Sequence, residues 1–211
     1  LRECNRILDY AKETSDHGLF FSSEGPSWDD CVVCSISDAS FNNDTTYVKT
    51  WDEANDRWTE IKEKNRSQQG YIVCLAPPDI LNARTAIIHP IVWSSAIIKR
   101  VCRSTLMAET FSMIRATEQG ARIRAAVVDA RGLLTLKKWE ESASRHMSHV
   151  WLTDCDSLYE HLVSPKSQQV GNKRLNIDLM ALRQQVWERD GERTQFVDSS
   201  SGDYPRWIDT S

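Results

Sequence analysis

Two acidic residues follow directly on a short apolar stretch in the segment HVWLTDCDSL. Asp154 and Asp156 come at the end of the run 150–153, and a helical pattern that buries Leu158 and Leu162 begins at once. A short apolar strand that leads into a helix is typical of a parallel strand, and open α/β sheets carry their ligand sites beyond the carboxyl ends of such strands. Asp154 therefore lies where a functional carboxylate is expected.

Two further acids lie on segments that can meet Asp154. Asp38 comes near the end of residues 31–40, CVVCSISDAS, which are rich in β-branched and small apolar residues and predict a strand buried on both faces. Glu109 lies in the second turn of a helix predicted over 105–120, whose remaining face is apolar enough to pack on that sheet. Three acids from separate segments can therefore converge at one rim of the sheet.

Clustered carboxylates suggest a particular chemistry. They repel one another and lose hydration, so that shared protons, a basic neighbour or divalent cations must neutralise them. Sites made of oxygen ligands suit magnesium or manganese. Each acid taken alone also has a structural explanation, because Asp154 and Asp156 can cap the helix that follows and Glu109 can be a solvated helix residue. The spacing alone leaves both interpretations open.

The order of the predicted elements indicates a mixed α/β fold in which helices flank one sheet. The predicted strands are 31–40, 70–75, 87–93, 150–153 and 205–209. The predicted helices are 1–13, 50–65, 105–120, the segment after 153, and 175–186. The helix at 50–65 is inferred from an apolar face that includes Trp51 and Trp58. Residues 121–140 stay open between more helix and a short strand.

Composition predicts a soluble globular protein, with 40% hydrophobic and 27% charged residues. A formal charge of -4 predicts no strong general attraction to nucleic acid. No apolar run approaches the roughly 20 residues that a membrane helix needs, so no membrane partner is expected. The six cysteines are scattered, which favours reduced thiols. Cys31 and Cys34 have a CxxC spacing, but in a strand they point to opposite faces.

Several motifs occur in an order that resembles the ribonuclease H domain of copia-type LTR retrotransposon polyproteins. The opening LRECNRILDYAKETSDHGLFF is similar to the helix and turn that join reverse transcriptase to ribonuclease H in those polyproteins. The other motifs are SISDASF at 35–41, RSQQGYIV at 66–73, IVWSS at 91–95, RSTLMAE at 103–109, WLTDCDSL at 151–158 and KRLNIDL at 173–179. The resemblance therefore covers nearly the whole chain.

This resemblance implies a fold and a domain organisation. Residues 27–211 are expected to form a ribonuclease H-like domain, with a mixed five-stranded sheet flanked by helices. Residues 1–26 are expected to be the tail of the reverse transcriptase region. The helix near 50–65 would be an insertion, since residues 42–65 are longer than the family usually has between its first two strands.

The resemblance also implies catalytic residues and cofactors. By position, the catalytic and metal-binding acids are Asp38, Glu109 and Asp154, which would hold two Mg²⁺ or Mn²⁺ ions. Asp156 takes no catalytic role. The family's fourth acid is expected beyond Ser211, so the domain is expected to be truncated at its C-terminus. The implied reaction is hydrolysis of the RNA strand in an RNA–DNA hybrid.

The implied partners are that hybrid and the reverse transcriptase domain of the same polyprotein. Phosphate contacts are expected from Arg100 and Arg103, and from Ser104 and Thr105 in the turn before the helix that carries Glu109. Other basic residues are also candidates, although each can equally belong to a solvated helix face: Lys99, Arg115, Arg122, Arg124, Lys137 and Lys138. The implied location is intracellular, in a cytoplasmic virus-like particle or in the nucleus.

Two alternatives keep the fold but change the function. The acidic balance and the missing fourth acid favour a ribonuclease H-fold module that binds nucleic acid, or has a structural role, without cleaving anything. The other alternative is a different metal-dependent nuclease, such as an integrase-like enzyme or an exonuclease. Affinity for magnesium separates the first alternative from an active hydrolase, and substrate preference separates the second.

Overall fold

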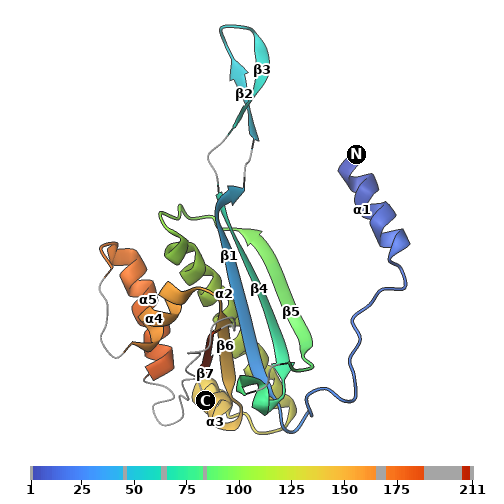
Figure 1. Ribbon diagram of the computed structural model, residues 1–211, viewed down its shortest axis with the longest axis vertical. Coiled ribbons are helices and arrows are strands. Elements are labelled where there is room, and N and C mark those ends of the chain that lie inside the picture. The colour runs from blue at the N-terminus through green and yellow to red at the C-terminus, as the bar shows by residue number, and fades with distance from the viewer. Residues whose placement is uncertain are drawn as a thin grey trace.

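The computed structural model describes residues 2–44, 47–62, 66–82, 85–164, 170–187 and 206–209 (Figure 1). Its helices are α1 (Arg2–Glu13), α2 (Thr105–Ala130), α3 (Trp139–His146), α4 (Asp156–Val163) and α5 (Lys173–Trp187), with 3-10 helices η1 (Pro78–Leu81) and η2 (Leu136–Lys138). Its strands are β1 (Val32–Asp44), β2 (Tyr47–Asp52), β3 (Arg57–Lys62), β4 (Arg66–Ala76), β5 (His89–Ile97), β6 (His149–Thr153) and β7 (Arg206–Asp209). Within the described residues, no helix is both long enough and apolar enough to cross a membrane.

The main sheet has the strand order β5-β4-β1-β6-β7. Strand β1 runs parallel to β6 and antiparallel to β4, and the pairs β4–β5 and β6–β7 are antiparallel. Helix α2 packs against β1, β4 and β6, while α4 and α5 pack against each other and against α2. The predicted mixed α/β fold, with helices beside a mixed sheet, is therefore confirmed.

Side chains alternate along β1 between two environments. Val33 and Cys31 pack in a cluster with residues of α2, whereas Cys34 and Val32 pack in another cluster with Ile80 of η1. Cys31 and Cys34 thus lie on opposite faces, as their spacing predicted. The face of β1 that carries Val33 is covered by α2, and the face that carries Cys34 points away from it.

Helix α2 approaches β1 closely because Gly120 has no side chain. The Ser35 hydroxyl donates a hydrogen bond of 3.1 Å to the carbonyl oxygen of Ala116 and lies 2.8 Å from Nε2 of the buried His149. A Cβ atom on Gly120 would overlap both the His149 ring and the Ser35 hydroxyl. This contact fixes the distance between the helix that carries Glu109 and the strand that carries Asp38.

Gly120→Ala is expected to lower the free energy of unfolding by about 1–3 kcal/mol, the usual cost of overpacking a core. Urea denaturation followed by circular dichroism measures this change. Gly171→Ala is the control, because nothing lies within 4 Å of the position that its Cβ would take. Equal destabilisation of both variants would show that the collision with His149 and Ser35 is not the cause.

The helix predicted at 50–65 is wrong, because the structure has the antiparallel hairpin β2–β3 there. Trp51 and Trp58 are direct cross-strand partners, with ring centroids 5.5 Å apart in an edge-to-face arrangement. Asp52 builds the turn: its carboxylate accepts hydrogen bonds from the backbone N–H of Ala54 at 3.2 Å and from Nδ2 of Asn55 at 2.8 Å. The hairpin projects from the body beyond the end of β1 (Figure 1).

A spacing of seven residues explains this error. It places Trp51 and Trp58 on one face of a helix, but it also places them opposite each other across a short turn. Residues 63–65, the end of the predicted helix, lie outside the described residues.

The other predicted elements are present. The strands at 31–40, 70–75 and 87–93 are the longer β1, β4 and β5, and the helix at 1–13 is α1. The open segment 121–140 is resolved as helix up to Ala130, after which Gly132 takes a φ of 72°. The division between 1–26 and 27–211 stays a prediction.

Candidate metal centre

The structure brings together the three acids that the sequence singled out. One carboxylate oxygen from each of Asp38, Glu109 and Asp154 lies within 4.8 Å of the others. Asp38 and Asp154 each come two residues after a parallel-paired residue, since Ile36 of β1 pairs with Leu152 of β6. Asp154 therefore follows the carboxyl end of β6 and lies beside Asp38, which is within β1 at the point where its pairing with β6 stops.

Hydrogen bonds from α2 to the sheet hold Glu109 beside these aspartates. The Ser112 hydroxyl, one turn after Glu109, lies 2.8 Å from the carbonyl oxygens of both Asp38 and Gly70, and its proton is shared between them. The backbone N–H of Ala39 donates to Oε1 of Glu109 at 3.3 Å. Helix α2 is thus anchored to β1 and to β4 at the level of the carboxylates.

Glu109 is the buried member of the cluster, at 4% exposure, whereas Asp38 and Asp154 are exposed. Its Oε2 atom is buried and has no hydrogen-bond partner among the described residues. Burial, together with the negative charges of Asp38 and Asp154, raises the pKa of Glu109 to about 7, although the Ala39 N–H lowers it. Since buried polar atoms normally have partners, this oxygen indicates a missing proton or cation.

A divalent cation fits this donor set. All three ligands are carboxylate oxygens, which magnesium and manganese prefer over the nitrogen and sulfur ligands of zinc. Because Asp38 and Asp154 are exposed, water molecules and a substrate oxygen can reach the remaining coordination positions. A cation between the carboxylates would offset their repulsion and give Oε2 of Glu109 a partner.

The structural explanations considered for Asp154 and Glu109 do not hold in the structure. Helix α4 has Cys155 as its N-cap and no side-chain capping bond, so Asp154 does not cap it. The backbone N–H of Cys155 instead donates to the Thr153 hydroxyl at 3.1 Å. Glu109 is buried rather than solvated. Asp156 lies in the first turn of α4, outside the cluster of three.

Three of the four residues predicted to contact nucleic acid share one groove. Arg100, Arg103 and Ser104 line a groove of about 1080 Å³ between the β5–α2 connection and the start of α5, whereas Thr105 is not among its lining residues. Ser104 caps α2, because its hydroxyl accepts the backbone N–H of Met107 at 3.2 Å. Its oxygen is therefore already engaged in the helix cap.

Two basic residues that sequence reasoning missed line the same groove. Lys173 and Arg174 are exposed at the start of α5, where the Asn172 side chain caps the helix by accepting the N–H of Arg174 at 3.1 Å. The adjacent pair in KRLNIDL was the available signal, but nothing local places it beside Arg100 and Arg103. We call Arg100, Arg103, Lys173 and Arg174 the basic groove.

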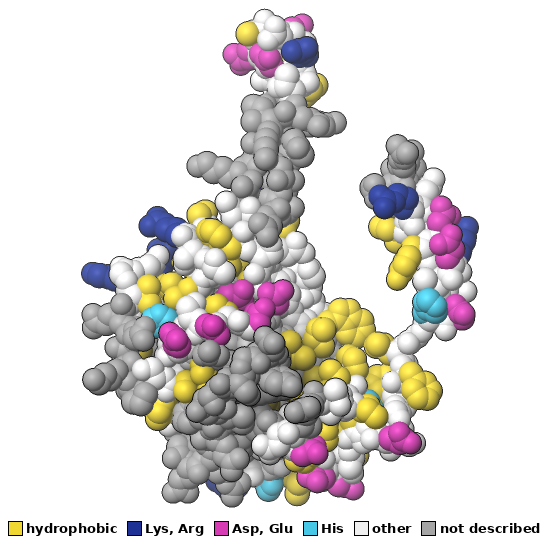
Figure 2. Space-filling view, in the orientation of Figure 1, with side chains coloured by type: hydrophobic (Ala, Val, Ile, Leu, Met, Phe, Trp, Pro, Cys, Tyr) yellow, Lys and Arg dark blue, Asp and Glu magenta, His cyan; other side chains and the backbone are white. Residues whose placement is uncertain are grey.

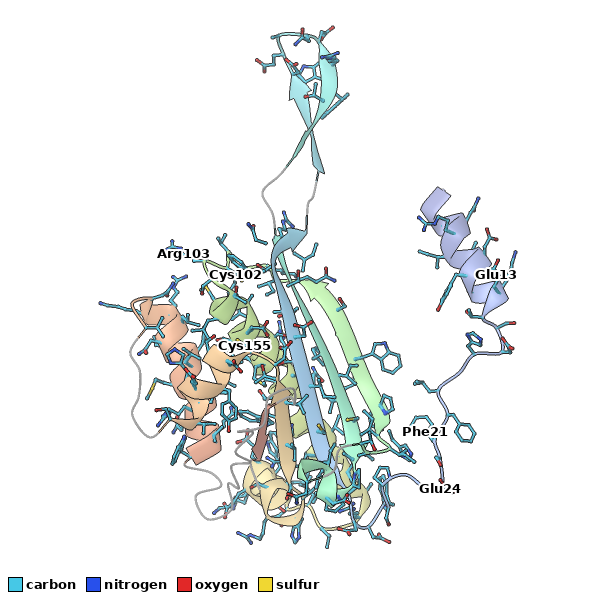
Figure 3. All side chains as sticks on the ribbon, in the orientation of Figure 1. Glu13, Phe21, Glu24, Cys102, Arg103 and Cys155 are labelled. Atoms are coloured by element: carbon cyan, nitrogen blue, oxygen red, sulfur yellow. The ribbon has the colours of Figure 1, made fainter. Side chains whose placement is uncertain are left out.

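The figures show how the acids and the basic groove are arranged. Figure 3 places Cys155, the residue after Asp154, near the middle of the viewed face, and Arg103 near the start of α2 beside α5. Asp and Glu side chains gather near the middle of that face, and Lys and Arg side chains gather on its α5 side (Figure 2). The carboxylates and a cationic surface thus lie on the same side of the molecule.

Comparison with known proteins identifies no relative, so function must be inferred from the geometry of this site. The chain matches no protein-family model, no curated protein and no solved structure.

Proposed function

We propose that this chain is a metal-dependent nuclease of the ribonuclease H-like fold that hydrolyses the RNA strand of RNA–DNA hybrids, as part of a retrotransposon polyprotein. The observation that carries the proposal is the cluster of Asp38, Glu109 and Asp154, with the buried, unpartnered Oε2 of Glu109. The mixed sheet in the order β5-β4-β1-β6-β7, with helices packed beside it, is consistent with the five-stranded domain that the sequence resembles.

The three acids have distinct roles in this proposal. Two Mg²⁺ ions held by them would activate the attacking water and stabilise the leaving 3′ oxygen. Asp38 and Asp154 are exposed, so they lie on the side from which substrate and water approach. Glu109 would be the inner ligand; because its pKa is raised to about 7, it would have to release its proton in order to hold a cation at neutral pH.

The basic groove would attract the phosphates of nucleic acid locally, although the net charge of the whole protein is negative. The net charge of -4 disfavours general binding of nucleic acid, so contact with phosphates must be local. Four cations from two segments line one groove. Hybrids are recognised through their shape, their 2′-hydroxyls and their phosphates rather than through a base code. The groove would therefore position the duplex without sequence preference.

A substrate comparison tests the proposed activity. Labelled RNA–DNA hybrid, duplex DNA, duplex RNA and single-stranded RNA are each incubated with the protein in Mg²⁺ and in EDTA. Cleavage of RNA in the hybrid alone, and only with Mg²⁺, is the expected result. Cleavage of duplex DNA would favour another metal-dependent nuclease. Binding of the hybrid without cleavage would favour the inactive nucleic-acid-binding module. The basic groove is compatible with that alternative as well, since it requires only binding.

The double variant Lys173→Glu/Arg174→Glu is expected to weaken binding of the hybrid about equally for different sequences. The dependence of log K on log salt should also become shallower, by about 0.9 for each phosphate that the variant no longer neutralises. Fluorescence anisotropy at several salt concentrations measures both quantities.

The control for this variant is Lys137→Glu/Lys138→Glu, which makes the same change of net charge at η2, away from the basic groove. Its binding is expected to stay close to that of the wild type. Equal weakening by both double variants would mean that net charge, and not the groove, determines affinity.

A further inference from the structure

An apolar row crosses the face of the sheet that points away from α2. Cross-strand pairing aligns Leu152, Ile36, Ile72 and Trp93 on strands β6, β1, β4 and β5. Exposure rises along the row, from 9% at Leu152 to 42% at Ile72 and 59% at Trp93. Ile91, two residues before Trp93 on the same side of β5, is also exposed. An apolar surface this continuous indicates a binding partner.

Helix α1 has an apolar stripe of its own. Cys4, Ile7, Leu8 and Ala11 follow one another at spacings of three, one and three, and all four are exposed. An isolated helix of about 12 residues is marginal in water, because most helical stability in proteins comes from packing of an apolar face. The stripe therefore requires a surface to cover it.

The linker after α1 is attached at the edge of the apolar row. The Phe21 ring meets the ring of His89, the first residue of β5, edge to face with centroids 5.2 Å apart. Gly25 lies against the same ring, and a Cβ atom there would overlap it. A register shift in β5 pairs His89 with Leu75, which packs on the α2 side of the sheet, so both contacts hold the end of the linker on the face opposite Trp93. Because β5 is the edge strand, the linker can reach the apolar row by passing around that edge.

The linker is long enough to bring the two apolar surfaces together. The eight steps between consecutive Cα atoms from Glu13 to Phe21 reach at most about 28 Å, whereas Trp93 lies about 13 Å along β5 from His89. A 12-residue helix is about 18 Å long, which is longer than the roughly 10 Å between the axes of β1 and β5, so it can span β1, β4 and β5 together. Gly18, with open space around it, lies within this linker. In Figure 1, α1 stands beyond β5, and in Figure 2 hydrophobic side chains gather over β4 and β5 on that side.

We propose that α1 docks in the same chain on the row Ile36, Ile72 and Trp93, with Ile7 and Leu8 against the exposed β4–β5 end. The tether favours this occupant, since the linker gives α1 a high effective concentration at the row. The docked helix covers the face opposite α2 and protects the open edge of β5. This inference goes beyond the proposed nuclease function and does not depend on it.

Hydrogen–deuterium exchange of the full chain tests this docking. The amides of α1 are expected to be protected in the wild type. Leu8→Asp, on the stripe, and Trp93→Lys, on the row, should each raise the exchange rate of these amides at least about tenfold. Asn5→Asp adds the same charge as Leu8→Asp beside the stripe and should leave the protection unchanged. Trp93→Phe keeps an aromatic side chain and should also retain it.

Two results would overturn the proposal. The first is exchange of α1 at the rate of an unstructured peptide in the wild type, unchanged by Leu8→Asp. The second is protection that appears only as the protein concentration rises, with a dimer mass in light scattering, which would assign the row to a second copy. Exchange of β1 amides in each variant shows whether the domain itself remains folded.

Discussion

Asp38→Asn is expected to reduce cleavage of the RNA–DNA hybrid by at least about 100-fold, the loss that follows removal of one group that stabilises transition-state charge. Asparagine has nearly the volume of aspartate, but it removes the negative charge and an anionic ligand oxygen from the cluster. Because Asp38 is exposed, the substitution leaves no buried group unpaired and should not weaken the fold. Single-turnover cleavage at saturating Mg²⁺ measures the chemical step.

Asp156→Asn is the matched control for this variant. It makes the same chemical change on an exposed acid that lies two residues from Asp154 but outside the cluster. Its cleavage rate is expected to stay within about twofold of the wild type. Wild-type activity in Asp38→Asn would refute the assignment of this residue as a metal ligand. Urea denaturation of both variants excludes an effect through folding.

Glu109→Gln is expected to stabilise the metal-free protein at alkaline pH. The pKa of Glu109 is raised to about 7 from its ordinary 4.5, first by burial and then by Asp38 and Asp154. Between these two values the folded protein holds a proton that the unfolded chain has released. The free energy of unfolding therefore falls as pH rises from about 4.5 to about 7, by at most about 3 kcal/mol.

The variant removes this titration, since glutamine stays neutral at every pH. In EDTA, Glu109→Gln should be about 1–3 kcal/mol more stable than the wild type at pH 8 and nearly equal to it at pH 4. Magnesium should reverse the order at pH 8. The wild type gains stability from cation binding to the folded state, whereas the variant has lost its inner ligand. Urea midpoints at both pH values, with EDTA or with Mg²⁺, measure the four free energies.

Glu118→Gln provides the control on the same helix. Glu118 is half-exposed and pairs with Arg115 at 3.8 Å, so its loss should change stability little under any of these conditions. Equal stabilisation of the wild type and Glu109→Gln by Mg²⁺ would place the cation elsewhere. A Glu109→Gln variant that is less stable than the wild type in EDTA at pH 8 would mean that the carboxylate has a favourable partner.

Local patterns were sufficient for most elements and singled out the acids, whereas their assignment as metal ligands came from the family resemblance. Helical spacing of apolar residues located α1, α2, α4 and α5, because burial of one face imposes that period. Short runs rich in β-branched and apolar residues located β1, β4, β5 and β6, because a strand buried on both faces needs no polar alternation. Asp154 stood out because it follows a buried strand, and Asp38 because it is a carboxylate near the end of a predicted buried strand, although β1 continues beyond it to Asp44.

The same reasoning gave the wrong prediction for the hairpin β2–β3. The spacing of Trp51 and Trp58 fits both a helix and a hairpin, and only the turn built by Asp52 distinguishes the two structures.

Only the tertiary structure showed that the three carboxylates meet in one cluster and that Glu109 is buried there. The sequence by itself determined that three carboxylates lie on, or directly after, core elements. Packing of α2 on β1, through Gly120 and Ser112, buries Glu109 and raises its pKa, and no local pattern encodes that depth. Lys173 and Arg103 likewise line the same groove only because α5 packs beside α2. Sequence periodicity reports which face of an element is buried, whereas the groups that meet across elements depend on contacts between residues far apart in the chain.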